Sequence, residues 1–495
     1  MAENKFRKRA LEYLKTIDKV IEQGPYKDNW DSLAGHPVPD WYRDAKLGIF
    51  IHWGIYSVPA FGSEWYPRWM YHKDHRIYKH HVEKYGTLDL FGYKDFIPLF
   101  KAENFSAMEW AELFEKSGAR FVTPVAEHHD GFPMYDCQFT DWNATKMGPK
   151  RDIVGELKAE VEKRGMTFTA SSHRIEHYWF MGGHNKLEAS DIKDPEYGHL
   201  YWPSAEDLTD MQSLTELTPS KEFMEDWLVR TCELIDKYRP KIVYFDWWIQ
   251  IQPLKPYLKK LAAYYYNRAA EWGEQVTINY KNDAMAHTSA VRDIERGQLS
   301  DVSPYFWQND TSVAKNSWCY TEGNDYKQPV DVICDLLDVC SKNGSLLLNI
   351  GPKADGTIPE KDKEILLAMG DFLKANGEGI YGSYPFRKFG EGPTQITEGH
   401  FTDTARTPFT AEDFRFTCKP GVVYCFALRE SLDGVYRVKS LNAGGKGIGL
   451  HAPIKEIRML GSDEAVSFVH NKDYLTIITP PTNFGRPVCF KIVVD

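Results

Sequence analysis

The sequence predicts one complete helix–strand unit in the stretch Ser106-Ala-Met-Glu-Trp-Ala-Glu-Leu-Phe-Glu-Lys-Ser-Gly-Ala-Arg-Phe-Val-Thr-Pro-Val-Ala-Glu-His-His-Asp-Gly131. Ser106 and Glu109 form a capping box, which marks the start of a helix, and Gly118 marks its end. The apolar run from 119 to 126 follows at once and predicts a buried strand. Polar residues come directly after that run. This order of helix, turn, strand and polar end recurs along the first three-quarters of the chain.

The recurring units predict a parallel sheet. Seven strand candidates, separated mostly by helices, are Leu47–Trp53, Ala119–Ala126, Met166–Ser171, Ile242–Phe245, Val276–Asn279, Val302–Trp307 and Leu346–Ile350. Repeated βα units produce a parallel sheet because each helix carries the chain back to the same edge. Either a doubly wound open sheet or a (β/α)8-type barrel fits this order. No G-x-G-x-x-G or Walker A sequence follows a strand candidate, which disfavours nucleotide binding.

The pattern changes in the last quarter of the chain. Short alternating runs, such as Val422–Leu428, Ile454–Met459 and Leu475–Ile478, are separated by turn residues. Such runs predict a small antiparallel sandwich. We therefore predict two domains, with the βα repeats in residues 1–380 and a β-sandwich in residues 385–495.

Composition limits the class of partner. The chain has 495 residues, of which 42% are hydrophobic and 26% charged, with a net charge of −10. This balance is typical of a folded globular protein. A nucleic-acid binder would show a basic field, and a membrane span would need an apolar run of roughly 18 residues. The sequence shows neither, so we expect no nucleic-acid or membrane partner, and whether the chain forms a homo-oligomer is left open.

The N-terminus and the cysteines indicate no special processing. The basic residues between Lys5 and Arg9 are not followed by the apolar core of a signal peptide. A cytoplasmic location is therefore expected unless a leader has been removed. None of the eight cysteines forms a C-x-x-C pair, which disfavours a zinc ribbon or a thioredoxin-type site.

Polar side chains gather where the strand candidates end. His52 ends the first, His128 and His129 follow the second, His173 follows the third, and Asp246 ends the fourth. In a barrel the active site lies at this end of the strands. A single strand-end histidine is usually structural, but several in register favour a functional site.

Two carboxylates carry the chemistry that we expect. Asp246 interrupts the apolar run from Ile242 to Ile249, where a buried carboxylate needs partners. A helix N-cap is the structural alternative for Asp246, and a nucleophile or base is the functional one. Glu295 follows the next strand and can face the same opening. A nucleophile and a proton donor of this kind serve a retaining glycosidase, and Trp65 and Trp247 offer faces on which a sugar would stack.

A zinc hydrolase is the metal alternative. His173-Arg-Ile-Glu176-His177 matches H-x-x-E-H. That pattern places both histidines on one face only when it lies on a helix. Here it follows a strand directly, so we expect no zinc site and no other metal or organic cofactor.

Three long strings resemble the family 29 glycoside hydrolases, the α-L-fucosidases. They are Leu47-Gly-Ile-Phe-Ile-His-Trp-Gly-Ile-Tyr-Ser-Val-Pro59 followed by Ser63-Glu-Trp-Tyr66, then Glu127-His-His-Asp-Gly-Phe132, then Ser341-Lys-Asn-Gly-Ser-Leu-Leu-Leu-Asn-Ile-Gly-Pro-Lys-Ala-Asp-Gly-Thr-Ile-Pro359. The resemblance covers residues 30–385. It implies an imperfect (β/α)8-like TIM barrel followed by a β-sandwich. It also implies retaining hydrolysis of terminal α-L-fucose from fucosylated oligosaccharides or glycoconjugates.

The resemblance also implies roles for individual residues. Asp246 would be the nucleophile and Glu295 the acid/base, with Asp293 or Glu176 as the next candidates for the acid/base. The residues expected to contact fucose are His52, Glu64, Trp65, His128, His129 and Trp318. The chain departs from the family's pattern at three places. Trp247-Trp248 follow the nucleophile, Lys281 stands in place of an arginine, and Ser171 stands in place of a tyrosine whose contacts His173, Glu176 or His177 would take over. A fucose-binding barrel without turnover is the alternative from another functional class.

Overall fold

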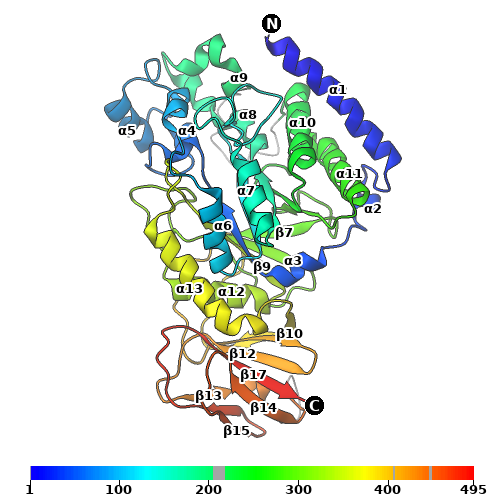
Figure 1. Ribbon diagram of the computed structural model, residues 1–495, viewed down its shortest axis with the longest axis vertical. Coiled ribbons are helices and arrows are strands. Elements are labelled where there is room, and N and C mark those ends of the chain that lie inside the picture. The colour runs from blue at the N-terminus through cyan, green and yellow to red at the C-terminus, as the bar shows by residue number, and fades with distance from the viewer. Residues whose placement is uncertain (1, 204–217, 405–406, 445–448) are drawn as a thin grey trace.

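The computed structural model describes residues 2–203, 218–404, 407–444 and 449–495. Its larger part is a closed parallel β-barrel surrounded by helices (Figure 1). The sheet order is β1-β9-β8-β7-β6-β5-β4-β2-β3, and β2 also pairs with β1, which closes the barrel. β3 and β4 both pair with β2 and together fill one of eight positions. The strands are β1 Leu47–Ile51, β2 Phe121–Glu127, β3 Thr167–Phe168, β4 Ala170–Ser172, β5 Ile242–Phe245, β6 Thr277–Tyr280, β7 Val291–Glu295, β8 Trp307–Ser312 and β9 Gly344–Ile350.

The helices begin where the sequence provides caps. The Ser106 side chain accepts a hydrogen bond from the Glu109 N–H at the start of α6, and Asp152 accepts one from Gly155 at the start of α7. Because β1 pairs with β2 and closes the sheet, the predicted barrel is confirmed over the open sheet. The helices are α1 Ala2–Gln23, α2 Trp30–Leu33, α3 Asp40–Ala45, α4 Tyr66–Trp69, α5 Arg76–Tyr85, α6 Ala107–Lys116, α7 Ile153–Lys163, α8 His177–Phe180, α9 Gly198–Tyr201, α10 Lys221–Tyr238, α11 Lys255–Trp272, α12 Pro329–Ser341 and α13 Glu360–Asn376.

Two strands differ from the prediction. The seven strand candidates do not include β7, and they place the sixth strand at Val302–Trp307, whereas β8 begins at Trp307. Both strands are rich in polar residues, so an apolar pattern could not reveal them. Their polar groups are buried with partners instead: the Gln308 amide donates to Asp293, and the Asn309 amide donates to backbone carbonyls.

The barrel interior is layered. Phe50, Phe121, Tyr244 and Leu347 form an apolar cluster with Tyr42 of α3. Side chains alternate along a strand, so a residue two places after an inward-facing one also faces inward. Asp246, two residues after Tyr244, therefore also faces the barrel interior. The polar groups of the site thus lie next to an apolar layer of the same interior.

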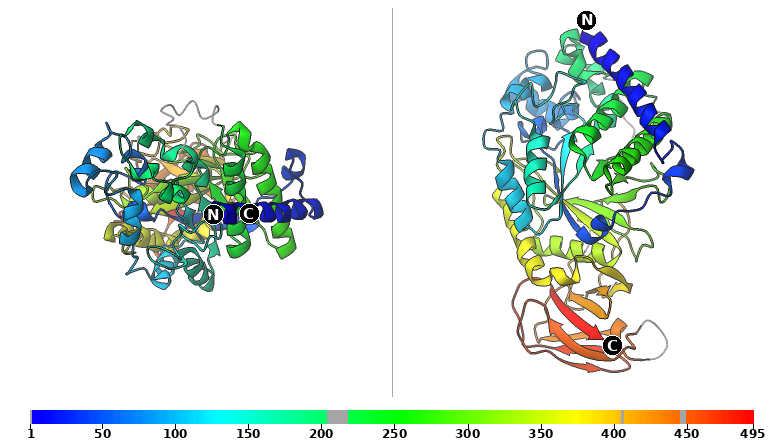
Figure 2. Two further views of the ribbon diagram at one scale, coloured as in Figure 1. Left: turned by 90° about the horizontal axis from the view of Figure 1, so that it is seen from above. Right: turned by 45° about the vertical axis from the view of Figure 1, so that its right-hand side comes forward.

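The C-terminal part is a two-sheet sandwich. One sheet has the order β10-β11-β12-β17-β14 and the other β13-β16-β15, and all pairs are antiparallel. Their inner faces share a separate apolar core. The sandwich packs on α12 at the end of the molecule opposite α1, which lies along α10 and α11 (Figures 1 and 2). The strands are β10 Tyr384–Glu391, β11 Phe414–Lys419, β12 Val422–Ala427, β13 Val435–Val438, β14 Ile454–Met459, β15 Ser467–His470, β16 Leu475–Ile478 and β17 Val488–Val494.

Among the described residues, no helix has the length and apolar character of a membrane span.

Candidate active site

The carboxyl ends of the barrel strands meet around a cavity of about 240 Å³. This volume suits one small ligand, since drug-sized sites occupy ~300–1,000 Å³. Ten of the predicted residues line it: His52, Glu64, Trp65, His128, His129, His173, Asp246, Trp247, Glu295 and Trp318. Glu176 and Lys281 do not line the cavity and lie behind its wall, in contact with residues that do.

Asp246 follows β5 and is held as a carboxylate. Burial alone would raise its pKa, but contacts with His129 and His173 and the charge of Lys281 outweigh burial and hold the pKa well below its usual range. Its Oδ2 lies 3.5 Å from His173 Nδ1 and 3.8 Å from His129 Nε2, and its Oδ1 lies 3.6 Å from Lys281 Nζ. The group is therefore an ionised nucleophile or base at neutral pH.

Glu295 ends β7 and is shifted the other way. Burial and the nearby charge of Asp246 raise its pKa to about 7, although Lys281 and a hydrogen bond from Trp247 oppose the rise. The Trp247 indole N–H donates to Glu295 Oε2 at 2.5 Å. Glu295 is thus poised to give up and take back a proton near neutral pH.

Lys281, two residues after Asn279 of β6, is the common cation of the site. Its Nζ lies 3.0 Å from Asp293, 3.1 Å from Glu295 and 3.1 Å from Asp310, in addition to its contact with Asp246. Asp246 Oδ1 lies 3.6 Å and Glu295 Oε2 lies 3.1 Å from this nitrogen, so the two carboxyl groups are close neighbours, in keeping with the ~5–5.5 Å separation of retaining glycosidases. Burial and the charge of Asp310 raise the pKa of Asp293 well above its usual range, so this carboxyl is held protonated below Glu295.

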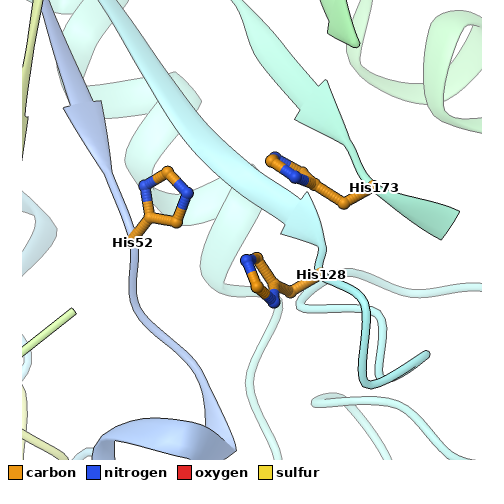
Figure 3. A group of neighbouring side chains, drawn as sticks. All are labelled: His52, His128 and His173. Atoms are coloured by element: carbon orange, nitrogen blue, oxygen red, sulfur yellow. The ribbon is translucent and has the colours of Figure 1, made fainter. Parts of the chain in front are cut away.

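Three histidines face one another from the ends of neighbouring strands β1, β2 and β4 (Figure 3). His52 Nδ1 is 2.7 Å from Asn349 Oδ1, so the other ring nitrogen, Nε2, takes no part in this contact. Burial and the other histidines hold the pKa values of His52 and His128 well below the usual range, so both rings are neutral. Neutral imidazoles can donate to and accept from the hydroxyls of a sugar.

The same histidines could hold a metal. One nitrogen from each of His52, His128 and His173 lies within 4.8 Å of the others, and a second group combines His129, His173, Glu176 and Asp246. Neutral imidazoles bind zinc at ~2.0–2.1 Å. His177, the other histidine of the H-x-x-E-H pattern, belongs to neither group, and its Nδ1 is 2.7 Å from the His129 carbonyl oxygen. The pattern lies on a short 3-10 turn and the four-residue helix α8.

Glu176 supports His129 from behind. His129 Nε2 contacts a Glu176 carboxylate oxygen, and both side chains are fully buried. Burial, followed by the charges of Asp246 and Glu295, raises the pKa of Glu176 well above its usual range. Burial lowers the pKa of His129 to about 4. The pair is therefore a neutral one that orients His129 toward Asp246.

One wall of the cavity is built from Glu64, Trp65 and Trp318. The Trp318 backbone N–H donates to Glu64 Oε2 at 3.1 Å, and the Trp318 carbonyl accepts from the Asn349 amide at 2.6 Å. The Trp318 ring lies 5.2 Å from His52, and the Trp65 ring meets His129 edge-on at 5.5 Å. Aromatic faces and polar groups thus alternate around the cavity, as a sugar with apolar and hydroxylated sides requires.

Sequence reasoning did not single out four lining residues: Phe50, Tyr244, Asp310 and Phe401. Asp310 lies on β8, whose polar sequence conceals the strand; its Oδ2 accepts a hydrogen bond from the Tyr244 hydroxyl at 2.9 Å. Phe401 comes from the connection between β10 and β11, more than 100 residues after Glu295. No local pattern could have placed Phe401 in the site.

The site has two neighbouring carboxylates whose pKa values are displaced in opposite directions, beside a pocket of a size for one sugar ring. This arrangement defines the class of protein as a glycoside hydrolase. Comparison with known proteins gives the family. The model of the family "Alpha-L-fucosidase" matches residues 14–378. This chain therefore belongs to the α-L-fucosidase family.

Relatives agree along most of the chain. Tissue alpha-L-fucosidase of Rattus norvegicus is 30% identical over 423 residues, which cover 84% of this chain and 81% of the relative. A crystal structure of Thermotoga maritima alpha-fucosidase in complex with fucose has a TM-score of 0.74 at 29% identity, and covers 94% of this chain and 100% of its own. The same enzyme in complex with a mechanism-based inhibitor has a TM-score of 0.76, with the same identity and coverage.

Proposed function

We propose that this chain is a retaining exo-α-L-fucosidase that removes terminal α-L-fucosyl residues from fucosylated glycans. The observation that carries the proposal is the pair Asp246 and Glu295: two buried carboxylates share one cation, yet one pKa is depressed and the other is raised to about 7. Such a pair supplies a nucleophile and a proton donor at the same pH. Membership of the α-L-fucosidase family supplies the sugar.

In the first step, the Asp246 carboxylate attacks the anomeric carbon of fucose. The bond to the leaving oxygen breaks, and Glu295 gives that oxygen its proton. A fucosyl ester of Asp246 and an ionised Glu295 result. Lys281 contacts both carboxylates, so its charge stays near the site while negative charge moves from one to the other.

In the second step, ionised Glu295 takes a proton from water, and the oxygen of that water attacks the anomeric carbon. The ester bond to Asp246 breaks, α-L-fucose leaves, and both carboxyl groups regain their starting states. Two inversions at one carbon give net retention. No metal or organic cofactor takes part in these steps.

The pocket recognises the sugar through groups that are already held in place. His52 is oriented by Asn349, and Glu64 is oriented by the Trp318 N–H. We assign these two residues, with His128, His129 and His173, to the fucose hydroxyls. Trp65 and Trp318 take the apolar face and the methyl group. Rigid placement lowers the entropic cost of binding.

The test is turnover of an aryl α-L-fucoside followed by proton NMR. We expect α-L-fucose to be the first anomer released, before mutarotation. Release of the β anomer would show an inverting reaction, and absence of turnover together with tight fucose binding would instead identify a fucose-binding barrel. A panel of α1,2-, α1,3- and α1,6-linked oligosaccharides then establishes the preferred linkage.

A further inference from the structure

The segment between β10 and β11 reaches back to the acid/base strand. The Gly399 N–H donates to the Gln298 carbonyl at 3.0 Å, the Phe401 N–H donates to the Glu295 carbonyl at 2.9 Å, and the Thr402 N–H donates to the Arg296 carbonyl at 2.7 Å. His400 Nδ1 accepts from the Glu295 N–H at 3.0 Å. Residues 399–403 therefore run beside residues 295–298 and pair with them as an added strand would.

This attachment is tight at both ends. A side chain at position 297 would collide with it, because a Cβ on Gly297 would lie 1.8 Å from the Gly399 carbonyl oxygen. Asp403, at the other end, accepts a hydrogen bond from the Thr311 hydroxyl at 2.6 Å and contacts Lys327 at 2.5 Å. Burial lowers the pKa of His400 to about 4, so its ring is neutral and remains an acceptor at neutral pH. The segment is a fixed part of the site.

The segment places an aromatic ring at the mouth of the cavity. The Phe401 ring is nearly parallel to that of Trp247, with planes 9° apart and centroids 6.2 Å apart. Phe401 is 57% exposed although it lines the cavity, and Trp247 is half-buried. Because the Phe401 ring is held in an exposed position, its burial contributes little to the stability of the fold.

The proposed role of Glu295 indicates which part of the substrate these rings face. The proposed acid/base must reach the oxygen that links fucose to its leaving group, and Trp247 donates its indole N–H to the same carboxylate. Phe401 is bonded to the Glu295 backbone. Both rings are therefore anchored to the residue that meets the leaving group, and they line the cavity beside that residue.

We propose that Trp247 and Phe401 form a binding platform for the leaving-group sugar, with their faces against the apolar C–H face of a pyranose ring such as galactose or N-acetylglucosamine. The inference rests on the proposed fucosidase function and adds a subsite to it. The part of the chain that forms the sandwich thereby contributes directly to substrate choice.

The experiment compares two substrates that differ only in their leaving group. α-L-Fucosyl fluoride has no leaving-group ring, whereas a fucosyl-α1,2-galactoside has one. In Phe401→Ala we expect the ratio of kcat/KM for the disaccharide to that for the fluoride to fall about tenfold, because ~50 Å² of apolar contact corresponds to roughly that factor. Phe401→Leu keeps apolar bulk without a flat face and should show a similar fall, whereas Phe401→Trp should preserve the ratio.

Phe484→Ala is the matched control, since Phe484 is 45% exposed and does not line the cavity. Its ratio should equal that of the wild type. Equal losses on both substrates in Phe401→Ala would overturn the platform while leaving the proposed function intact. Failure of the wild type to hydrolyse the fluoride would overturn the proposed function, and the platform with it. Thermal unfolding of each variant verifies that it is folded.

Discussion

At the scale of single residues, Asp246 and Glu295 show how the neighbours of a carboxyl group determine its chemistry. Both are enclosed, so desolvation raises both pKa values. Asp246 also meets two histidines and Lys281, and these partners more than compensate. Glu295 has Lys281 and the Trp247 indole, but it also faces the charge of Asp246. The difference in neighbours gives each carboxyl its protonation state.

The pKa of Glu295 predicts the alkaline limit of activity. The group must be protonated to assist departure of a sugar, and its pKa is raised to about 7. Activity on a fucosyl disaccharide should therefore be retained below pH 7 and fall as pH rises through about 7 to 8. Fucosyl fluoride needs no proton at its leaving group, so formation of the fucosyl-enzyme from it should decline less. The profile of kcat/KM against pH checks this, and disaccharide activity that still rises at pH 9 would contradict it.

Lys281 should control ionisation of the nucleophile. In Lys281→Met the carboxylates around it lose their shared cation, and the pKa of Asp246 should rise. We expect kcat/KM at acidic pH to fall, because a smaller fraction of Asp246 is then ionised, and the acidic limb of the pH profile should move upward. Lys281→Arg keeps the charge and should retain much more activity. An unchanged acidic limb in a folded Lys281→Met variant would show that Lys281 does not control Asp246.

At the scale of elements, the sequence predicts those parts whose pattern is local. The caps at Ser106 and Asp152 begin helices as expected, and the apolar strands β1, β2, β5 and β9 lie within one or two residues of their predicted positions or inside them. β8 could not be recognised because its stability comes from hydrogen bonds to distant residues, such as Gln308 with Tyr42. Phe401 could not be placed for the same reason: its position depends on pairing with a distant strand.

The histidines that end β1, β2 and β4 predict how metals affect the enzyme. We expect dialysis against EDTA to leave activity unchanged, because the proposed steps use no metal. Added Zn²⁺ should inhibit in competition with fucose, since one nitrogen from each of His52, His128 and His173 lies within 4.8 Å of the others. Initial rates at several zinc and substrate concentrations check this.

His173→Phe should weaken this inhibition by zinc, whereas His451→Phe, which changes an exposed histidine in the sandwich, should not. Loss of activity with EDTA, restored by stoichiometric zinc, would contradict the metal-free mechanism.

At the scale of the whole molecule, the barrel and the sandwich behave as one structure. Residues 399–403 join the site from one side, and a buried ion network joins α12 to β11 at another. Asp338 of α12 accepts from Arg415 at 2.5 Å and from Lys342 at 2.7 Å, and all three side chains are fully buried. Burial alone would raise the pKa of Asp338, but the two cations hold it below its usual range.

Loss of this network should destabilise the protein. Arg415→Met leaves part of a buried carboxylate unpaired, and breaking a buried pair costs about 3–5 kcal/mol. We expect a clear fall in the calorimetric unfolding temperature, with a smaller effect on kcat. Arg458→Met is the control, because Arg458 pairs with Glu456 on an exposed surface. Equal unfolding temperatures for the two variants would mean that the network contributes little to the union of the two parts.

The central claim is that Asp246 and Glu295 have different catalytic roles, and rescue by azide tests it most directly. In Asp246→Gly, azide should replace the nucleophile and convert an activated α-fucoside into β-fucosyl azide. In Glu295→Ala, azide should attack the fucosyl-enzyme from the opposite face and give α-fucosyl azide. Proton NMR distinguishes the two anomers. The same anomer from both variants, or full activity of Glu295→Ala on a natural disaccharide, would contradict the assignment.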